Sequence, residues 1–282
     1  MAQNAGFCYG VKRAVETTKK IKIENASKKV WVLGELIHNS HVISELEELG
    51  IITVEELPKN ETGVCIIRSH GMAPQKIKEI EQQGFEIVDL TCLDVKKVQQ
   101  KAIQLAQEDF LVLILGRPEH PEVIAIKANA EMYSDKVYVI SNIDELKGIT
   151  QEIKKHNKVG VVIQTTQKLE LLQEVSNYLI PLANELKIFN TICKSTSKRQ
   201  QEARELAKNS DLMIVVGSKK SANTTHLAEI LSEITNTIHI ETQKDLFNHK
   251  DLIEKAQNIG VTAGASTPDD IINDVIKEIE KI

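Results

Sequence analysis

Three of the four cysteines stand in similar local segments that are spread along the whole chain. Cys8, Cys92 and Cys193 are far apart in the sequence, and each is followed after a few positions by a pair of basic residues. One cysteine in each of three repeats is the pattern expected of a site at which three repeated units meet. Three thiolates can hold an iron–sulfur cluster while one iron keeps no protein ligand.

Composition excludes several classes of protein. The chain has 282 residues, a net charge of −5 and only 4% aromatic residues, which argues against a nucleic-acid-binding groove. No apolar run approaches the length of a membrane span, and the N-terminus lacks a signal-peptide pattern. The cysteines form no CxxC pairs and do not resemble a disulfide framework, so a reducing, cytoplasmic setting is expected.

Short apolar runs alternate with helical patterns, which is typical of parallel sheets covered by helices. The predicted strands are Val30–Leu33, Val64–Ile67, Leu111–Leu115, Val137–Ile140, Val159–Ile163, Leu212–Val216 and Ile259–Thr262. Helical patterns between them include Val42–Leu49, Val95–Gln107, Leu169–Ile180, Ser197–Ala207 and Ile271–Ile279.

Polar residues recur at similar intervals after each cysteine. The first set follows the three cysteines at nearly equal intervals and comprises His38, His120, Ser221 and Asn223. The second set follows at longer intervals and comprises His70, Thr165 and Ser266. All of them come after an apolar run, at the sheet edge where parallel α/β proteins bind ligands. The shorter interval is also the natural period of a βα unit, so spacing alone leaves coincidence open.

The expected fold is α/β, with three similar units that have small, mostly parallel sheets and a pseudo-threefold arrangement around a central iron–sulfur site. The first unit is expected at residues 10–92, the second at 93–189 and the third at 190–282. Residues 1–9 are expected to join the third unit.

Nine short segments of the chain match the motifs of a known protein family. They are Asn4–Val15, Gly34–Asn39, Arg68–Gly71, Asp89–Cys92, His120–Val123, Gln164–Gln167, Asn190–Cys193, Gly217–Asn223 and Thr262–Pro268. Each is weak alone, but their order and spacing along nearly the whole chain are specific. Together they resemble the 4-hydroxy-3-methylbut-2-enyl diphosphate reductase family of the non-mevalonate isoprenoid pathway.

The resemblance implies an oxidoreductase that removes the allylic hydroxyl and forms isopentenyl and dimethylallyl diphosphate. It implies that Cys8, Cys92 and Cys193 bind a 4Fe-4S cluster whose fourth iron is open to the substrate. Reduced ferredoxin or flavodoxin is the implied electron donor, and neither nucleic acid nor a membrane is an expected partner. Cys65 lies inside a predicted strand and is expected to be a buried, structural thiol.

The resemblance also assigns the substrate-binding and catalytic residues. The implied substrate-binding residues are His38, His70, His120, Thr165, Ser221, Asn223 and Ser266. Catalysis is assigned to Glu122 as proton donor acting through Thr165, with His120 near the hydroxyl end. Without the resemblance, Glu122 is better explained as a first-turn carboxylate favoured by the helix dipole. Ser221 and Asn223, ahead of a helix predicted to start near Thr225, are also explained as capping residues.

The chain departs from the family pattern at three places. Ala222 replaces a serine that would be a further diphosphate donor. Ile124 stands where the family tends to carry a glycine after Val123. The family usually has a short apolar strand before its first cysteine, whereas here only Met1–Phe7 precede Cys8. Either that strand is abbreviated or the natural start lies upstream.

Three other functions fit parts of the pattern. Quinolinate synthase resembles a three-unit α/β protein with three cysteines, but its reaction has no net redox change. A cluster-bearing redox sensor is a second alternative, which the missing nucleic-acid footprint disfavours. The third is a phosphate-binding module whose cysteines are structural, and such a protein is colourless when iron is supplied.

Overall fold

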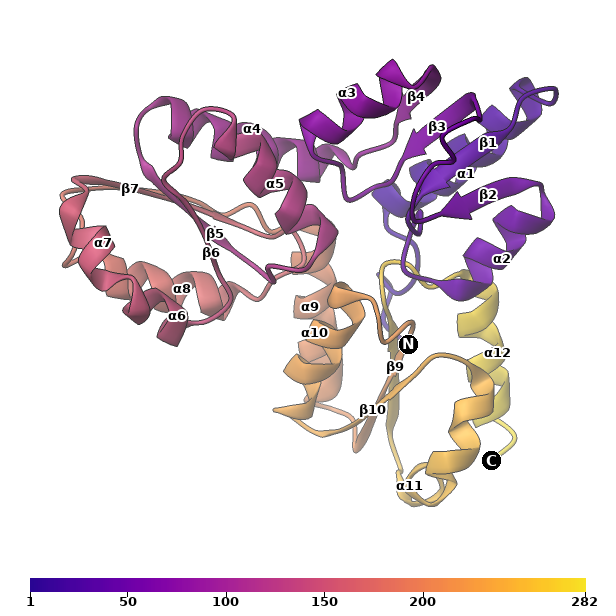
Figure 1. The fold of residues 1–282 in the computed structure, drawn as a ribbon. Helices are drawn as coiled ribbons and strands as arrows, with labels where there is room; N and C mark the ends of the chain where they lie inside the picture. Colours follow the sequence, from indigo (N-terminus) through magenta and orange to yellow (C-terminus); the bar gives the residue numbers. More distant parts are fainter. The chain divides into compact units, whose positions relative to one another are not determined.

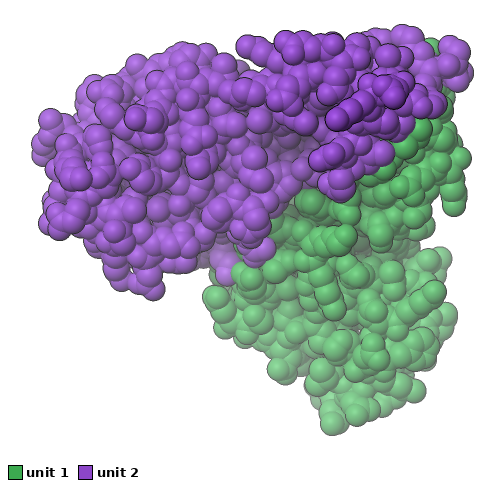
Figure 2. Space-filling model, viewed as in Figure 1, with its two compact units in different colours: residues 1–24, 35–53, 194–282 green, residues 25–34, 54–193 purple.

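The computed structural model describes residues 1–282 and divides into two compact units, shown in different colours in Figure 2. The first unit combines Met1–Glu24, Glu35–Thr53 and Lys194–Ile282. The second combines Asn25–Gly34 and Val54–Cys193. No helix has both the length and the apolar character required to cross a membrane.

Eleven strands form small sheets, and most of them are labelled in Figure 1. The strands are β1 (Val30–Leu33), β2 (Ile51–Val54), β3 (Gly63–Ile67), β4 (Phe85–Asp89), β5 (Leu111–Leu115), β6 (Val137–Ile140), β7 (Lys158–Ile163), β8 (Glu185–Phe189), β9 (Leu212–Val216), β10 (Asn236–Ile240) and β11 (Ile259–Ala263). The pairs β1–β3, β3–β4, β5–β6, β5–β7, β7–β8, β9–β10 and β9–β11 are all parallel.

Helices connect these parallel strands. They are α1 (Tyr9–Glu24), α2 (Ser40–Glu48), α3 (Pro74–Gln82), α4 (Leu93–Gln107), α5 (Pro121–Glu131), α6 (Ile143–Gly148), α7 (Thr150–Lys155), α8 (Leu169–Leu179), α9 (Lys194–Ala207), α10 (Ala222–Ser232), the 3-10 helix η1 (Gln243–His249), α11 (Lys250–Lys255) and α12 (Asp269–Ile279). The predicted α/β class with small parallel sheets is confirmed.

The sheets share one connection pattern. From β5 the chain crosses to β6 on one side and returns to β7 on the other, giving the order β6-β5-β7-β8. From β9 it crosses to β10 and returns to β11, giving the order β10-β9-β11. The pair β1–β3 is likewise adjacent, with Trp31 beside Cys65. The carboxyl ends of β5 and β7 therefore flank a topological switch point, and so do the carboxyl ends of β9 and β11. Open α/β sheets bind ligands at such points.

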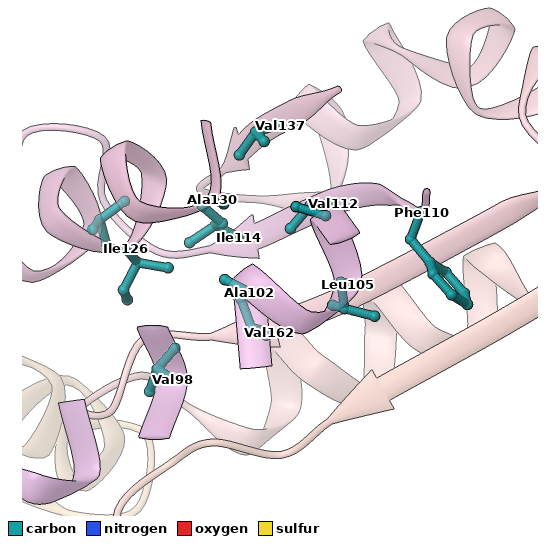
Figure 3. Packing of buried hydrophobic residues seen from close by; sticks show 12 residues of the cluster. Val98, Ala102, Leu105, Phe110, Val112, Ile114, Ile126, Ala130, Val137 and Val162 are labelled. Carbon is teal, nitrogen blue, oxygen red and sulfur yellow. The ribbon is translucent and has the colours of Figure 1, made fainter. Parts of the chain in front are cut away.

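Two apolar layers bury the sheet β6-β5-β7-β8. Val112 and Ile114 of β5 face α4 and α5, and the packing on this side is shown in Figure 3. Leu111, Leu113 and Leu115 face α6, α7 and α8 on the other side. This alternation with a period of two is what a strand requires, and burial on both faces explains why β5 is a continuous apolar run.

A glycine permits the close contact of α4 with this sheet. A methyl group on Gly160 of β7 would lie 2.5 Å from a methyl carbon of Leu105, which is fully buried. The sheet β10-β9-β11 has the same layered arrangement, with α9 and α10 on one face and η1, α11 and α12 on the other. Each sheet is thus a rigid support for the residues that follow its strands.

All seven predicted strands are present, and their bounds differ from the predicted ones by no more than a single position at either end. Four further strands were not predicted, namely β2, β4, β8 and β10. Each of them is partly exposed and carries polar residues, so it contains no continuous apolar run. The prediction of a helix starting near Thr225 was wrong by one turn, because α10 begins at Ala222.

Candidate functional site

Each of the three repeated cysteines lies immediately before a helix. Cys8 precedes α1, Cys92 is the N-cap of α4 and Cys193 precedes α9. None of the three is in a disulfide, and each is half-buried. The unpaired N–H groups and the dipole at a helix N-terminus favour an anionic group such as a thiolate.

The backbone around each cysteine is held in the same way. Each cysteine N–H donates to a carbonyl that lies just past the carboxyl end of a strand. The acceptors are Ala265 after β11 at 3.2 Å for Cys8, Ser69 after β3 at 2.9 Å for Cys92, and Thr165 after β7 at 3.0 Å for Cys193. The sequence repeat therefore corresponds to a repeat in three dimensions that presents one thiol at the carboxyl edge of a parallel sheet.

These thiols fit the chemistry of an iron–sulfur site. Thiolates are the ligands that such clusters require, and a backbone N–H also points to Cys8, with Val11 N 3.4 Å from Sγ. Cys65 is different, because it is fully buried in β3 and burial raises the pKa of its thiol to about 11. A neutral thiol of that kind is a packing residue, as predicted from its place in a strand.

Glu122 and Thr165 form a buried pair of side chains from α5 and the loop after β7. Glu122 is 2% exposed, and its Oε1 accepts the N–H of Thr165 at 2.7 Å. The Thr165 hydroxyl donates to Oε2, also at 2.7 Å. Burial raises the pKa of Glu122 to about 7, although the hydrogen bonds from Thr165 lower it. A carboxyl group with this pKa is suited to donate and accept protons near neutral pH.

His120 belongs to the same corner of the fold. It is the N-cap of α5, and its Nδ1 accepts the N–H of Glu122 at 3.2 Å. Because Nδ1 is the acceptor, a neutral His120 ring carries its proton on Nε2. The rings of His70 and His120 contact each other edge-on, with centroids 5.3 Å apart. The loops after β3, β5 and β7 therefore bring His70, His120 and Thr165 into one group with Glu122.

A second group joins the loops after β1 and β11. The Ser266 hydroxyl donates to the carbonyl of His38 at 3.3 Å, and Asn39 Nδ2 donates to the carbonyl of Ser266 at 2.9 Å. His38 Nδ1 lies 3.0 Å from one Glu35 carboxylate oxygen, and Lys220 contacts the other at 3.2 Å. Burial raises the pKa of Glu35, but the bonds from His38 and Lys220 outweigh it and lower the pKa.

Ser221 and Asn223 lie at the N-terminus of α10, after β9. Ser221 is the N-cap and accepts the N–H of Thr224, so the expected capping role is present. Asn223 is only 6% exposed, and its Nδ2 has no hydrogen-bond partner in the structure. Its Oδ1 is 3.5 Å from the hydroxyl of Thr196. A buried amide donor left unpaired beside a helix N-terminus is a feature that an oxyanion would satisfy.

Sequence reasoning missed some of the residues that orient these groups. Glu35 and Asn39 lie inside the quoted motif Gly34–Asn39, and Lys220 lies inside Gly217–Asn223. Their presence inside these motifs was the only sequence signal that could have identified them. The contacts of Asn39 with Ser266 and of Glu35 with Lys220 join residues that are far apart in the sequence. Two of the remaining histidines have ordinary surroundings: His41 lies near Asp270, and His239 contacts the Gly217 carbonyl.

Comparison with known proteins shows the family of this chain. The LytB protein family matches residues 1–280. The chain belongs to the LytB protein family. The family match confirms the resemblance drawn from the nine motifs, and the reductases among its relatives confirm the prediction of an oxidoreductase.

Relatives of the LytB family match over essentially their full lengths. A 4-hydroxy-3-methylbut-2-enyl diphosphate reductase of Pelobacter propionicus is 41% identical, and the match covers 100% of this chain and 97% of the relative. The Aquifex aeolicus protein with the same name is 37% identical, with 100% and 96% covered.

Two solved structures of LytB-family enzymes have the same fold. One is (E)-4-hydroxy-3-methyl-but-2-enyl diphosphate reductase, described as the terminal enzyme of the non-mevalonate pathway. It is 38% identical with a TM-score of 0.72, and the match covers 100% of this chain and 98% of the other. The second, the E-1-hydroxy-2-methyl-but-2-enyl-4-diphosphate reductase of Plasmodium falciparum, is 25% identical with a TM-score of 0.86, and 97% and 85% are covered.

Proposed function

We propose that this chain reduces 4-hydroxy-3-methylbut-2-enyl diphosphate to isopentenyl and dimethylallyl diphosphate. The observation that carries the proposal is the buried Glu122 carboxyl, which is bonded twice to Thr165 and has a pKa of about 7. The reaction consumes two electrons and two protons, breaks the allylic C–O bond, forms a C–H bond and releases water. A buried acid that titrates near neutral pH is the group that such a reaction needs from the protein.

We assign Cys8, Cys92 and Cys193 as the ligands of a 4Fe-4S cluster. None of the three is in a disulfide, each lies directly before a helix, and each backbone N–H is bonded to a carbonyl just past a strand. When bound, such a cluster would pass on the two electrons of an external donor and would offer a Lewis-acidic iron to the allylic hydroxyl oxygen. Reduced ferredoxin or flavodoxin is the proposed electron donor.

The diphosphate is assigned to His38, His70, Ser221, Asn223 and Ser266. The unpaired Nδ2 of Asn223 and the N-terminus of α10 support this role. Each hydrogen bond from a protein donor to a charged phosphate oxygen contributes roughly 1.5–3 kcal/mol, so several of them offset the desolvation of the anion. Ala222 removes one donor that the family pattern includes.

The hydroxyl end is assigned to Glu122, Thr165 and His120. The Thr165 hydroxyl is bonded to the Glu122 carboxyl, and it can pass a proton from Glu122 to the leaving oxygen. His120 has its Nδ1 bonded to backbone, so Nε2–H is its available donor. Reprotonated Glu122 then supplies the proton for the new C–H bond.

The proposal is tested by anaerobic purification with iron quantitation and an absorption spectrum, followed by turnover with the allylic diphosphate and a reduced viologen dye. We expect a brown protein that oxidises the dye with this substrate alone. A colourless protein under full iron supply would favour the phosphate-binding module. Iron-loaded protein that leaves the dye reduced would contradict the assigned reaction and leave the condensation chemistry of quinolinate synthase as the better account.

A further inference from the structure

The segment that carries Cys8 has no regular secondary structure. Residues 1–7 form neither helix nor strand. Two backbone hydrogen bonds hold the segment to β11 and the loop after it: Ala2 N donates to Val261 O at 2.9 Å, and Cys8 N donates to Ala265 O at 3.2 Å. A segment of this kind needs further contacts to keep a thiol in one place.

The side chain of Arg199 on α9 supplies one of these contacts. Arg199 is 3% exposed, and Nη2 donates to the carbonyl of Gly6 at 2.9 Å. Its Nη1 donates to the carbonyl of Ala263, the last residue of β11, at 2.7 Å. One planar guanidinium therefore ties the backbone just ahead of Cys8 to the end of a buried strand.

The side chain of Glu202, one turn later on α9, supplies a second contact. One carboxylate oxygen accepts the N–H of Asn4 and its Nδ2, both at 2.8 Å, and the other accepts the N–H of Gln3. Burial raises the pKa of Glu202, but the hydrogen bonds from Asn4 and Gln3 outweigh it and lower the pKa. The carboxylate is therefore ionised at neutral pH and accepts hydrogen bonds from three donors of the segment.

We propose that Arg199 and Glu202 are positioning residues that hold the Cys8 thiol in place. This inference rests on the proposed role of Cys8 as a cluster ligand. Helix α9, which carries Arg199 and Glu202, begins directly after Cys193. This one helix therefore adjoins one assigned ligand and holds the segment of a second, Cys8. Arg199 belongs to the basic pair of the third repeat, whose other member, Lys198, is exposed.

The basic pairs of the other repeats have different contacts. Lys12 lies 3.9 Å from Glu16 on the surface of α1, and Lys96 lies 2.6 Å from Asp89. Neither of these ion pairs joins a helix to the irregular segment before Cys8. Among these basic pairs, the contacts that hold the segment before Cys8 are thus made by the third repeat.

The test measures the reactivity of each cysteine in the full-length chain prepared without iron. Alkylation rates with iodoacetamide are followed by mass spectrometry for wild type, Arg199→Met, Glu202→Gln and the exposed control Lys198→Met. Loss of these charged hydrogen bonds, which are buried for Arg199 and more exposed for Glu202, should raise the Cys8 rate by up to about tenfold while Cys92 and Cys193 stay within about twofold. Amide hydrogen exchange of residues 6–8 should accelerate in parallel.

A variant that keeps the charge guards against a general loss of structure. Arg199→Lys keeps the charge on a single donor nitrogen, which cannot reproduce the two-pronged contact of the guanidinium, and its Cys8 rate should lie between those of wild type and Arg199→Met. The proposal is overturned when no folded variant exposes Cys8 selectively, whether the rate stays unchanged or all three cysteines react faster together. The iron content of the reconstituted wild type is measured separately. If that protein binds no iron, the assignment of a cluster is wrong, whereas the alkylation result still tests the positioning of Cys8.

Discussion

Replacing Glu122 with glutamine should remove activity and, at alkaline pH, make the protein more stable. The amide has the shape of the carboxyl group, so its oxygen still accepts the N–H of Thr165 and its NH₂ donates to the Thr165 hydroxyl. It cannot donate a proton to a leaving oxygen. Loss of a positioned general acid typically lowers the rate by roughly 10²- to 10⁴-fold, so we expect kcat to fall by about that factor while iron content is retained.

The effect on stability follows from the pKa of Glu122. Burial raises this pKa from 4.5 to about 7, so the folded state binds the proton more tightly than the unfolded state. Wild-type stability therefore decreases as pH rises from about 4.5 to about 7, and the full decrease is about 3 kcal/mol. Glutamine does not titrate, so the variant lacks this decrease.

The measurement compares urea unfolding of wild type and Glu122→Gln at about pH 5 and about pH 8.5, where most of the difference should appear. Glu119→Gln is the matched control, since Glu119 is exposed just ahead of the same helix and its replacement should leave both stability and turnover unchanged. A pH-independent difference between wild type and Glu122→Gln would refute the assigned burial and pKa. Near-wild-type turnover of the variant would remove Glu122 from the mechanism.

Three further predictions concern the assigned cluster ligands, the packing of β7 and the assigned anion site. Cys92→Ala should lose most of the iron, whereas Cys65→Ala should retain it, as measured by iron quantitation after anaerobic reconstitution. Gly160→Ala should destabilise the protein by about 1–3 kcal/mol in urea unfolding, because the added methyl group overlaps Leu105. Asn223→Asp should raise KM for the diphosphate at least about tenfold through charge repulsion, and a KM unchanged from wild type would contradict the assigned anion site.

The sequence predicted the central strands well and the exposed ones poorly. Runs such as Leu111–Leu115 are buried on both faces, so they appear in the sequence as unbroken apolar segments. β8 and β10 are edge strands with Lys187 and His239 among their residues, and half-exposed strands do not need apolar side chains at every position. Their pairing depends on a neighbouring strand that lies elsewhere in the sequence.

The composition of the candidate site was also predictable in part. Parallel strands place their carboxyl ends at one edge, so residues such as His120 and Thr165, which follow predicted strands, were expected there. The hydrogen bonds between Glu122 and Thr165 were not predictable from the residues, because these residues are 43 positions apart and first-turn carboxylates are common. The family resemblance was needed to single out Glu122.

The amino-acid sequence by itself determined the α/β class, the central strands and the three cysteines that begin similar segments, because apolar periodicity and local spacing are written along the chain. Only the tertiary structure decided the protonation behaviour of Glu122 and the attachment of the Cys8 segment through Arg199 and Glu202. Burial and long-range hydrogen bonds set both, and these depend on which distant segments pack together. A pattern of neighbouring residues contains no record of that packing.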